Sequence, residues 1–193
     1  ADYVHDHRNG GTGLITNLSG GAGPYLHGIV DWPATMRFGY DMGTTARTVI
    51  NGWAYADYQV MARIAGELGN AADRNTFWSR ADALEAAMNA RLLNGSGVYV
   101  DGLDSGGSPS AHVSQHANMF PLALGTVPEG SRASVVAKVK EMEMSVGMVT
   151  LPWLVRAIGE AGEGEHLLEL FTNESWLGWA RCLSRGATAT WES

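Results

Sequence analysis

Apolar residues recur at intervals of three and four along most of the chain after residue 44, which is the pattern of amphipathic helices. The first such run covers residues 44–68 and ends at Gly69 and Asn70, a typical helix stop. The second run covers residues 77–92 and ends at Asn94 and Gly95. Because few residues separate them, the two runs predict an antiparallel helical hairpin.

Five further helical runs follow a stretch rich in glycine and serine at residues 95–109. They cover residues 113–124, 131–142, 151–161, 165–171 and 176–183. We expect about seven helices and no strand pair, since the apolar triplet at 98–100 is too short to form a sheet. Tight connections alternate with long ones, which favours an all-α ring of helical hairpins with its site on the long-loop face. A compact helical bundle is the alternative, and it predicts connections of more equal length.

The chain reads as a single domain over residues 1–193 that begins with a loop-rich segment at residues 1–30. Glycine clusters at 10–13 and 20–23 interrupt any helical or strand period there. They do not form a phosphate-binding loop, because no apolar strand precedes them and no Gly-Lys-Ser/Thr follows.

Composition excludes several classes of partner. The formal net charge is −7 and the chain has no run of lysine and arginine, so neither nucleic acid nor an anionic membrane surface is an expected partner. Cys182 is the one cysteine, which allows no internal disulfide and no cysteine-type zinc site. We expect no cofactor, and the sequence does not distinguish a cytoplasmic from a periplasmic or secreted location.

Acidic, aromatic and imidazole side chains concentrate between the helical runs, which suits a carbohydrate. Aromatic faces cover the apolar side of a sugar ring, and carboxylates and amides bind its hydroxyls. We expect Trp53 and Trp78 to pack in the core. His112 and His116 have a zinc-like spacing on one helix face, but no adjacent glutamate or third ligand accompanies them. We interpret these two histidines as part of the wall of the sugar site and expect no metal ion.

Three stretches resemble bacterial α-L-rhamnosidases in their order and spacing. They are VDWPATMRFGYDM at residues 30–42, HVSQHAN at 112–118 followed by ALG at 123–125, and RGATATWE at 185–192. The resemblance implies an (α/α)6 toroid of six helical hairpins that hydrolyses terminal α-L-rhamnosyl residues with inversion. It also implies that Asp31 binds a sugar hydroxyl, that Arg37 is the loop arginine and that Glu192 is the general base.

Inversion needs a protonated carboxyl at the glycosidic oxygen and a carboxylate that activates water, about 6.5–9.5 Å apart. Phe38 stands where the family has its acid and cannot donate a proton. Asp41 is then the first candidate and Asp31 the second; otherwise the chain takes another substrate or does not hydrolyse. The expected substrate-binding residues are Trp32, Arg37, His112, His116, Asn118, Trp153 and Trp191.

Seven helices amount to about half of a six-hairpin ring, so we expect a fragment of a larger enzyme with weak activity at best. Its exposed apolar helix faces would favour self-association or contact with the missing remainder. The alternative function is a non-catalytic carbohydrate-binding or scaffold remnant of such a glycosidase.

Overall fold

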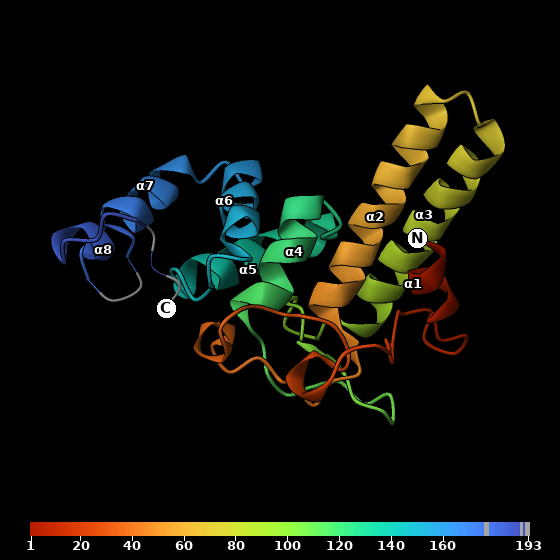
Figure 1. The fold of residues 1–193 in the computed structure, drawn as a ribbon, viewed down its shortest axis with the longest axis horizontal. Helices are drawn as coiled ribbons and strands as arrows, with labels where there is room; N and C mark the ends of the chain where they lie inside the picture. Colours follow the sequence, from red (N-terminus) through yellow and green to blue (C-terminus); the bar gives the residue numbers. More distant parts are fainter. Residues whose placement is uncertain (176–177, 190, 192–193) are drawn as a thin grey trace.

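The computed structural model describes residues 1–175, 178–189 and 191. Three helical hairpins make up about half of this part of the chain (Figure 1). Their helices are α2 (Thr48–Glu67) with α3 (Ala71–Arg91), α4 (Gln115–Leu124) with α5 (Glu129–Glu141), and α6 (Leu151–Glu160) with α7 (Gly164–Thr172). The shorter elements are α1 (Asp2–Asp6), η1 (Gly23–Tyr25), η2 (Ala34–Arg37), β1 (Ala46–Arg47), β2 (Gly102–Leu103) and α8 (Ala180–Ser184).

Each hairpin closes through a short connection, and consecutive hairpins are joined by long ones. The closing connections are residues 68–70, 125–128 and 161–163, whereas residues 92–114 and 142–150 join the hairpins. Local chemistry supports the helix ends: the side chains of Asn70 and Ser114 cap α3 and α4, and Gly125 ends α4 with a φ of 73°. The alternation confirms the hairpin prediction, and the more equal connections of a compact bundle are not observed.

Helices α2, α4 and α6 form one layer in which α4 is central. The α4 helix packs against both α2 and α6, and nine of its ten residues are buried. Because each of the three is the first helix of a hairpin, all three run in the same direction. Their N-terminal ends therefore face the irregular segments gathered at the bottom of Figure 1.

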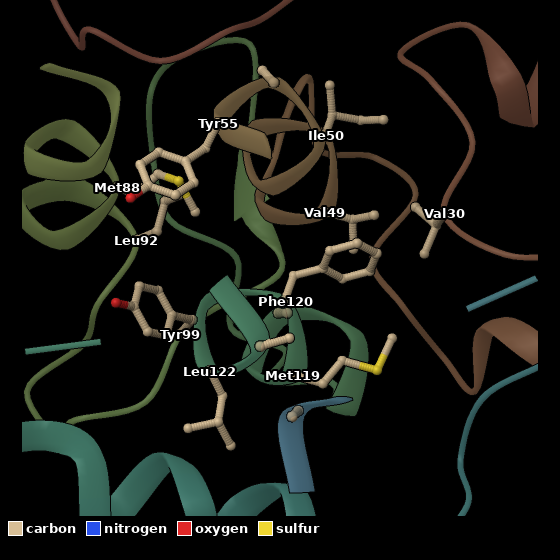
Figure 2. Close-up of a cluster of buried hydrophobic side chains, with 14 of the residues drawn as sticks. Val30, Val49, Ile50, Tyr55, Met88, Leu92, Tyr99, Met119, Phe120 and Leu122 are labelled. Carbon is tan, nitrogen blue, oxygen red and sulfur yellow. The ribbon is translucent and has the colours of Figure 1, made fainter. Parts of the chain in front are cut away.

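The hydrophobic core is continuous from α2 and α3 through α4 to α5, α6 and α7. Figure 2 shows Tyr55 of α2, Met88 of α3 and Phe120 of α4 converging with Tyr99 from the long connection. Tyr99 and Phe120 are fully buried. Burial of such side chains stabilises the fold by about 1.5–3 kcal/mol each, so this core fixes how the first two hairpins pack.

One prediction about the fold needs correction. A strand pair does exist: β1 pairs antiparallel with β2, with Ala46 opposite Leu103 and Arg47 opposite Gly102. Two-residue strands leave no periodic signal, and this pair forms because the long connection folds back on the start of α2. The loop-rich segment 1–30 also contains α1 and η1. Among the described residues, no helix is both long and apolar enough to span a membrane.

Candidate functional site

The sequence-predicted polar residues gather where α2, α4 and α6 begin. Residues 31–41, 101–116 and 147–150 meet at this end, which we call the loop end of the molecule. Helix N-termini carry partial positive charge, so three parallel helices favour carboxylates here. The loop end is accordingly where Asp31, Asp41 and Asp101 lie.

Asp31 is a buried junction between three segments of the chain. Its Oδ2 accepts hydrogen bonds from His116 Nε2 at 2.8 Å, from the Gly147 amide at 2.7 Å and from Thr150 Oγ1 at 2.5 Å. Its Oδ1 accepts from the amide of Trp32 at 2.8 Å. Burial raises the pKa of Asp31, but the hydrogen bonds from His116 and Thr150 outweigh it and hold the pKa below its ordinary value of 3.8. Asp31 is therefore an ionised anchor with no exposed surface.

Arg37 and Trp32 flank this anchor on the same loop. The Arg37 guanidinium donates from Nε to the Asp31 carbonyl oxygen at 3.2 Å and lies 5.3 Å from the ring centroid of Tyr25. Arg37 is buried, whereas Trp32 keeps 44% of its surface exposed and lies 6.1 Å from Tyr25. Of these two predicted ligand residues, only Trp32 has a side chain that is exposed enough to contact a ligand.

Asp101 organises a second cluster, together with Asp41, Ser110, His112 and Ser114. Its Oδ2 accepts from the Asp41 amide at 2.7 Å and from His112 Nδ1 at 2.6 Å, and its Oδ1 accepts from the Ser114 amide at 3.0 Å. The Ser110 hydroxyl donates to Asp41 Oδ2 at 2.7 Å and accepts from the His112 amide at 3.1 Å. Asp41 and His112 are therefore held side by side, both partly exposed.

Tyr40 closes this cluster from the inside. Its hydroxyl donates to the carbonyl oxygen of Asp101. Burial, together with the negative charge of Asp101, raises the pKa of Tyr40 far above its ordinary value. Tyr40 thus remains a neutral hydrogen-bond donor that supports the chain at residue 101.

The two histidines do not share a helix face, contrary to the prediction. Ser114 caps α4 by accepting from the Ala117 amide, so His112 lies before the helix and His116 within its first turn. Nor do they share a partner, because His112 bonds to Asp101 and His116 to Asp31.

His116 and Asn118 are fully buried on α4. Asn118 bonds to the backbone of Tyr99 through both Oδ1 and Nδ2, each at 2.9 Å. In this conformation His116 and Asn118 offer no surface to a ligand, and they fix the loops against the helix instead.

An aromatic cluster joins the first two turns of α2, α4 and α6. The ring centroids of Trp153 and Phe120 are 4.9 Å apart in a stacked arrangement, and Trp53 packs edge-on against Trp153 at 4.9 Å. The prediction that Trp53 lies in the core is wrong, since Trp53 remains 38% exposed, while Trp153 is half-buried. Trp53 is thus an available aromatic face that the sequence reasoning assigned to the core.

The structure describes residues 185–189 and 191 of the third predicted motif, RGATATWE at residues 185–192. Trp191 is 43% exposed, and Glu192, the predicted base, lies outside the described residues. Among the described residues, no three histidine, cysteine, aspartate or glutamate side chains are grouped closely enough to hold a metal ion.

Asp101 is the main residue that sequence reasoning missed. It lies in a glycine-rich turn, where it is indistinguishable from Asp104 by composition. The structure separates them, since Asp101 is fully buried while Asp104 is exposed and accepts from amides of its own turn. An available signal was the apolar triplet 98–100 directly before Asp101, which indicates a segment entering the core.

This layered array of helical hairpins, with acidic and aromatic groups at the loop end, is consistent with part of a six-hairpin glycosidase domain. The chain belongs to the bacterial alpha-L-rhamnosidase 6 hairpin glycosidase domain family, whose model matches residues 14–193. The predicted family and all-α fold class are therefore confirmed.

A solved structure described as an alpha-L-rhamnosidase from Dictyoglumus thermophilum is similar in fold. Its TM-score is 0.62 at 17% sequence identity, and the match covers 99% of this chain. The chain spans 27% of the length of that protein. No curated protein matches the sequence.

Proposed function

We propose that this domain binds a terminal α-L-rhamnosyl residue at its loop end and hydrolyses the glycosidic bond with inversion. Family membership supports a glycoside hydrolase. The observation that carries the proposal is the convergence of Asp41 and His112, two of the predicted sugar-site residues, on Asp101 at this end. Carboxylate and imidazole groups suit the many hydroxyls of a sugar, and exposed indoles suit its apolar face.

The proposed roles follow the accessibility of each group. Asp41 is the candidate proton donor, because its carboxyl is partly exposed, while the buried Asp31 acts as an anchor for the loop. Glu192 is the proposed base that activates water. Trp32, Trp53 and Trp191 have exposed ring surface available for the sugar.

The test is hydrolysis of an aryl α-L-rhamnoside, with the anomer of the product followed by NMR. We expect slow turnover, since Phe38 replaces the family's acid, and β-L-rhamnose as the first product. Glu192→Gln and Asp41→Asn should each lower kcat by about 10²–10⁴-fold, the usual contribution of an acid or base. Turnover that Glu192→Gln leaves unchanged would contradict the proposed mechanism.

A second candidate is a carbohydrate-binding remnant without catalysis. Two observations favour it: the phenylalanine at position 38 and the complete burial of Asp31. This candidate predicts saturable binding of L-rhamnose, measured by tryptophan fluorescence, with no product formed from the aryl rhamnoside.

The outer surface of α2 supports a further proposal about assembly. Val60 and Ile64 of α2 are 52% and 46% exposed, and Leu68, directly after the helix, is 78% exposed. Their spacing places them along one stripe of the helix. Additional hairpins of a larger chain or a second copy would bury this stripe, so self-association measurable by analytical ultracentrifugation is expected of the isolated chain.

A further inference from the structure

Asp101 is the point on which the two exposed polar groups of the proposed site depend. Its carboxylate is fully buried, yet both Asp41 and His112, which bond to it, reach the surface. The side chain of His112 is 40% exposed. A buried acid that fixes an exposed imidazole is the arrangement by which enzymes orient a histidine.

The contacts determine which nitrogen of His112 carries a proton. Asp101 Oδ2 lies 2.6 Å from Nδ1 and also accepts from the Asp41 amide, so the carboxylate acts as an acceptor on both sides. An ionised carboxylate has no proton to give, and Nδ1 must therefore be the donor. In the neutral imidazole Nε2 is then an unprotonated acceptor.

The position of Nε2 suits contact with a ligand. It has no hydrogen-bond partner among residues 1–175, 178–189 and 191. The loop after Phe38 passes close to it, since a Cβ added to Gly39 would lie 3.4 Å from Nε2. Asp41 is held alongside by the Ser110 hydroxyl, which bonds both to its carboxylate and to the His112 amide.

We propose that Asp101 is a positioning residue, which holds His112 in the Nδ1–H tautomer so that Nε2 accepts a hydrogen bond from a sugar hydroxyl beside Asp41. This inference rests on the proposed function and deepens it. It assigns an acceptor, the imidazole Nε2, to the polar edge of the sugar beside the Asp41 carboxyl group. Asp101 itself does not contact the ligand.

Imidazole ¹⁵N spectra of the labelled chain test the positioning directly. The chain has six histidines, and the signals that vanish in His112→Gln identify His112. We expect the Nδ1–H tautomer for His112 in the wild type. In Asp101→Asn the neutral amide can pair with either tautomer, its oxygen accepting from Nδ1–H or its nitrogen donating to bare Nδ1, so the preference for the Nδ1–H tautomer should fall. Asp104→Asn, the same change in an exposed turn of the same segment, should leave the tautomer as in the wild type.

Titration with L-rhamnose tests the ligand contact. We expect the His112 Nε2 signal to shift on binding, and Asp101→Asn and His112→Gln each to weaken the affinity about three- to tenfold, the effect of one hydrogen bond. If Asp101→Asn fails to fold, the wild-type tautomer still tests the role of Asp101, and the His112→Gln titration still tests the ligand contact.

The possible failures can be told apart. An Nε2–H tautomer in the wild type, or an unchanged tautomer in folded Asp101→Asn, overturns the positioning role. Saturable binding of L-rhamnose that leaves His112 Nε2 and the His112→Gln affinity unchanged overturns the ligand contact while sparing the proposed function. No binding of L-rhamnose to the wild type counts against the proposed function and the ligand contact, whereas the tautomer still decides the role of Asp101.

Discussion

Replacing Asp31 by asparagine removes one negative charge from the most heavily bonded carboxylate of the loop end. The variant has nearly the same shape, but one acceptor oxygen becomes an NH2 donor. If the amide oxygen keeps the place of Oδ2, it still faces His116, Gly147 and Thr150, while the NH2 group meets the amide of Trp32. In the other orientation three donors face the NH2 group. At least one buried donor therefore loses its acceptor.

The cost follows from the loss of charge and of satisfied partners. Hydrogen bonds to a charged group contribute about 1.5–3 kcal/mol each, and breaking a buried charged network by changing one member costs about 3–5 kcal/mol. We expect Asp31→Asn to lower the free energy of unfolding by about 3–5 kcal/mol. For a chain of this length, that corresponds to a fall in Tm of roughly 10 °C.

The pH dependence gives the prediction a second, independent readout. Because the pKa of Asp31 is lower in the folded chain than its ordinary value of 3.8, the stability that its charge contributes is complete above that value. It is lost as the pH falls through the folded-state pKa. The stability difference between wild type and Asp31→Asn should therefore be constant from pH 7 to about pH 5 and shrink below about pH 4.

Urea unfolding followed by circular dichroism at several pH values measures both effects. Asp104→Asn is the matched control, since the same change in an exposed turn should cost less than about 1 kcal/mol. A cost below 1 kcal/mol for Asp31→Asn at pH 7, or a difference that grows as the pH falls from 5 to 3, would refute this reasoning.

Three further predictions concern the surroundings of the site. Gly147→Ala should lower the free energy of unfolding by about 1–3 kcal/mol, because its methyl group would lie 2.7 Å from a backbone oxygen of the neighbouring loop. Gly130→Ala has open space around the added methyl group in α5 and should raise the free energy of unfolding by about 0.5–1 kcal/mol. Chemical denaturation of the two variants measures both changes. Arg47→Lys should loosen the loop-rich segment 1–30 and speed its cleavage in limited proteolysis, since a lysine cannot reproduce the fork of guanidinium bonds to backbone oxygens there. Phe120→Ala should lower the free energy of unfolding by about 3–5 kcal/mol, and Trp53→Ala should lower it less, because Trp53 keeps exposed surface. Equal losses of stability in thermal unfolding would show that Trp53 contributes to the core as much as Phe120 does.

Much of the fold is predictable from the sequence because helices leave a local signal. Apolar spacing located α2 and α3, and the stop signals at residues 69–70 and 94–95 marked their ends to within a few residues. The contrast between short and long connections also indicated the end of the hairpins at which the predicted polar residues lie. These features depend on residues a few positions apart, so they can be predicted from short stretches of the sequence.

The arrangement of the site depends on contacts between residues far apart in the sequence. Asp31 is bonded to residues 116, 147 and 150, and Tyr40 to residue 101. Nothing local distinguishes an aspartate that will be buried from one that will be exposed in a turn. These loops meet because α4 packs between α2 and α6.

By itself the sequence determined the helices and their pairing, because spacing and residue type are local properties. The tertiary structure decided which polar groups are exposed and which are anchors, turning Asp31 and His116 inward and leaving Asp41 and His112 at the surface. The physical reason is burial: whether a carboxylate faces water or four donors is set by the packing of three hairpins, and no short stretch of residues encodes that packing.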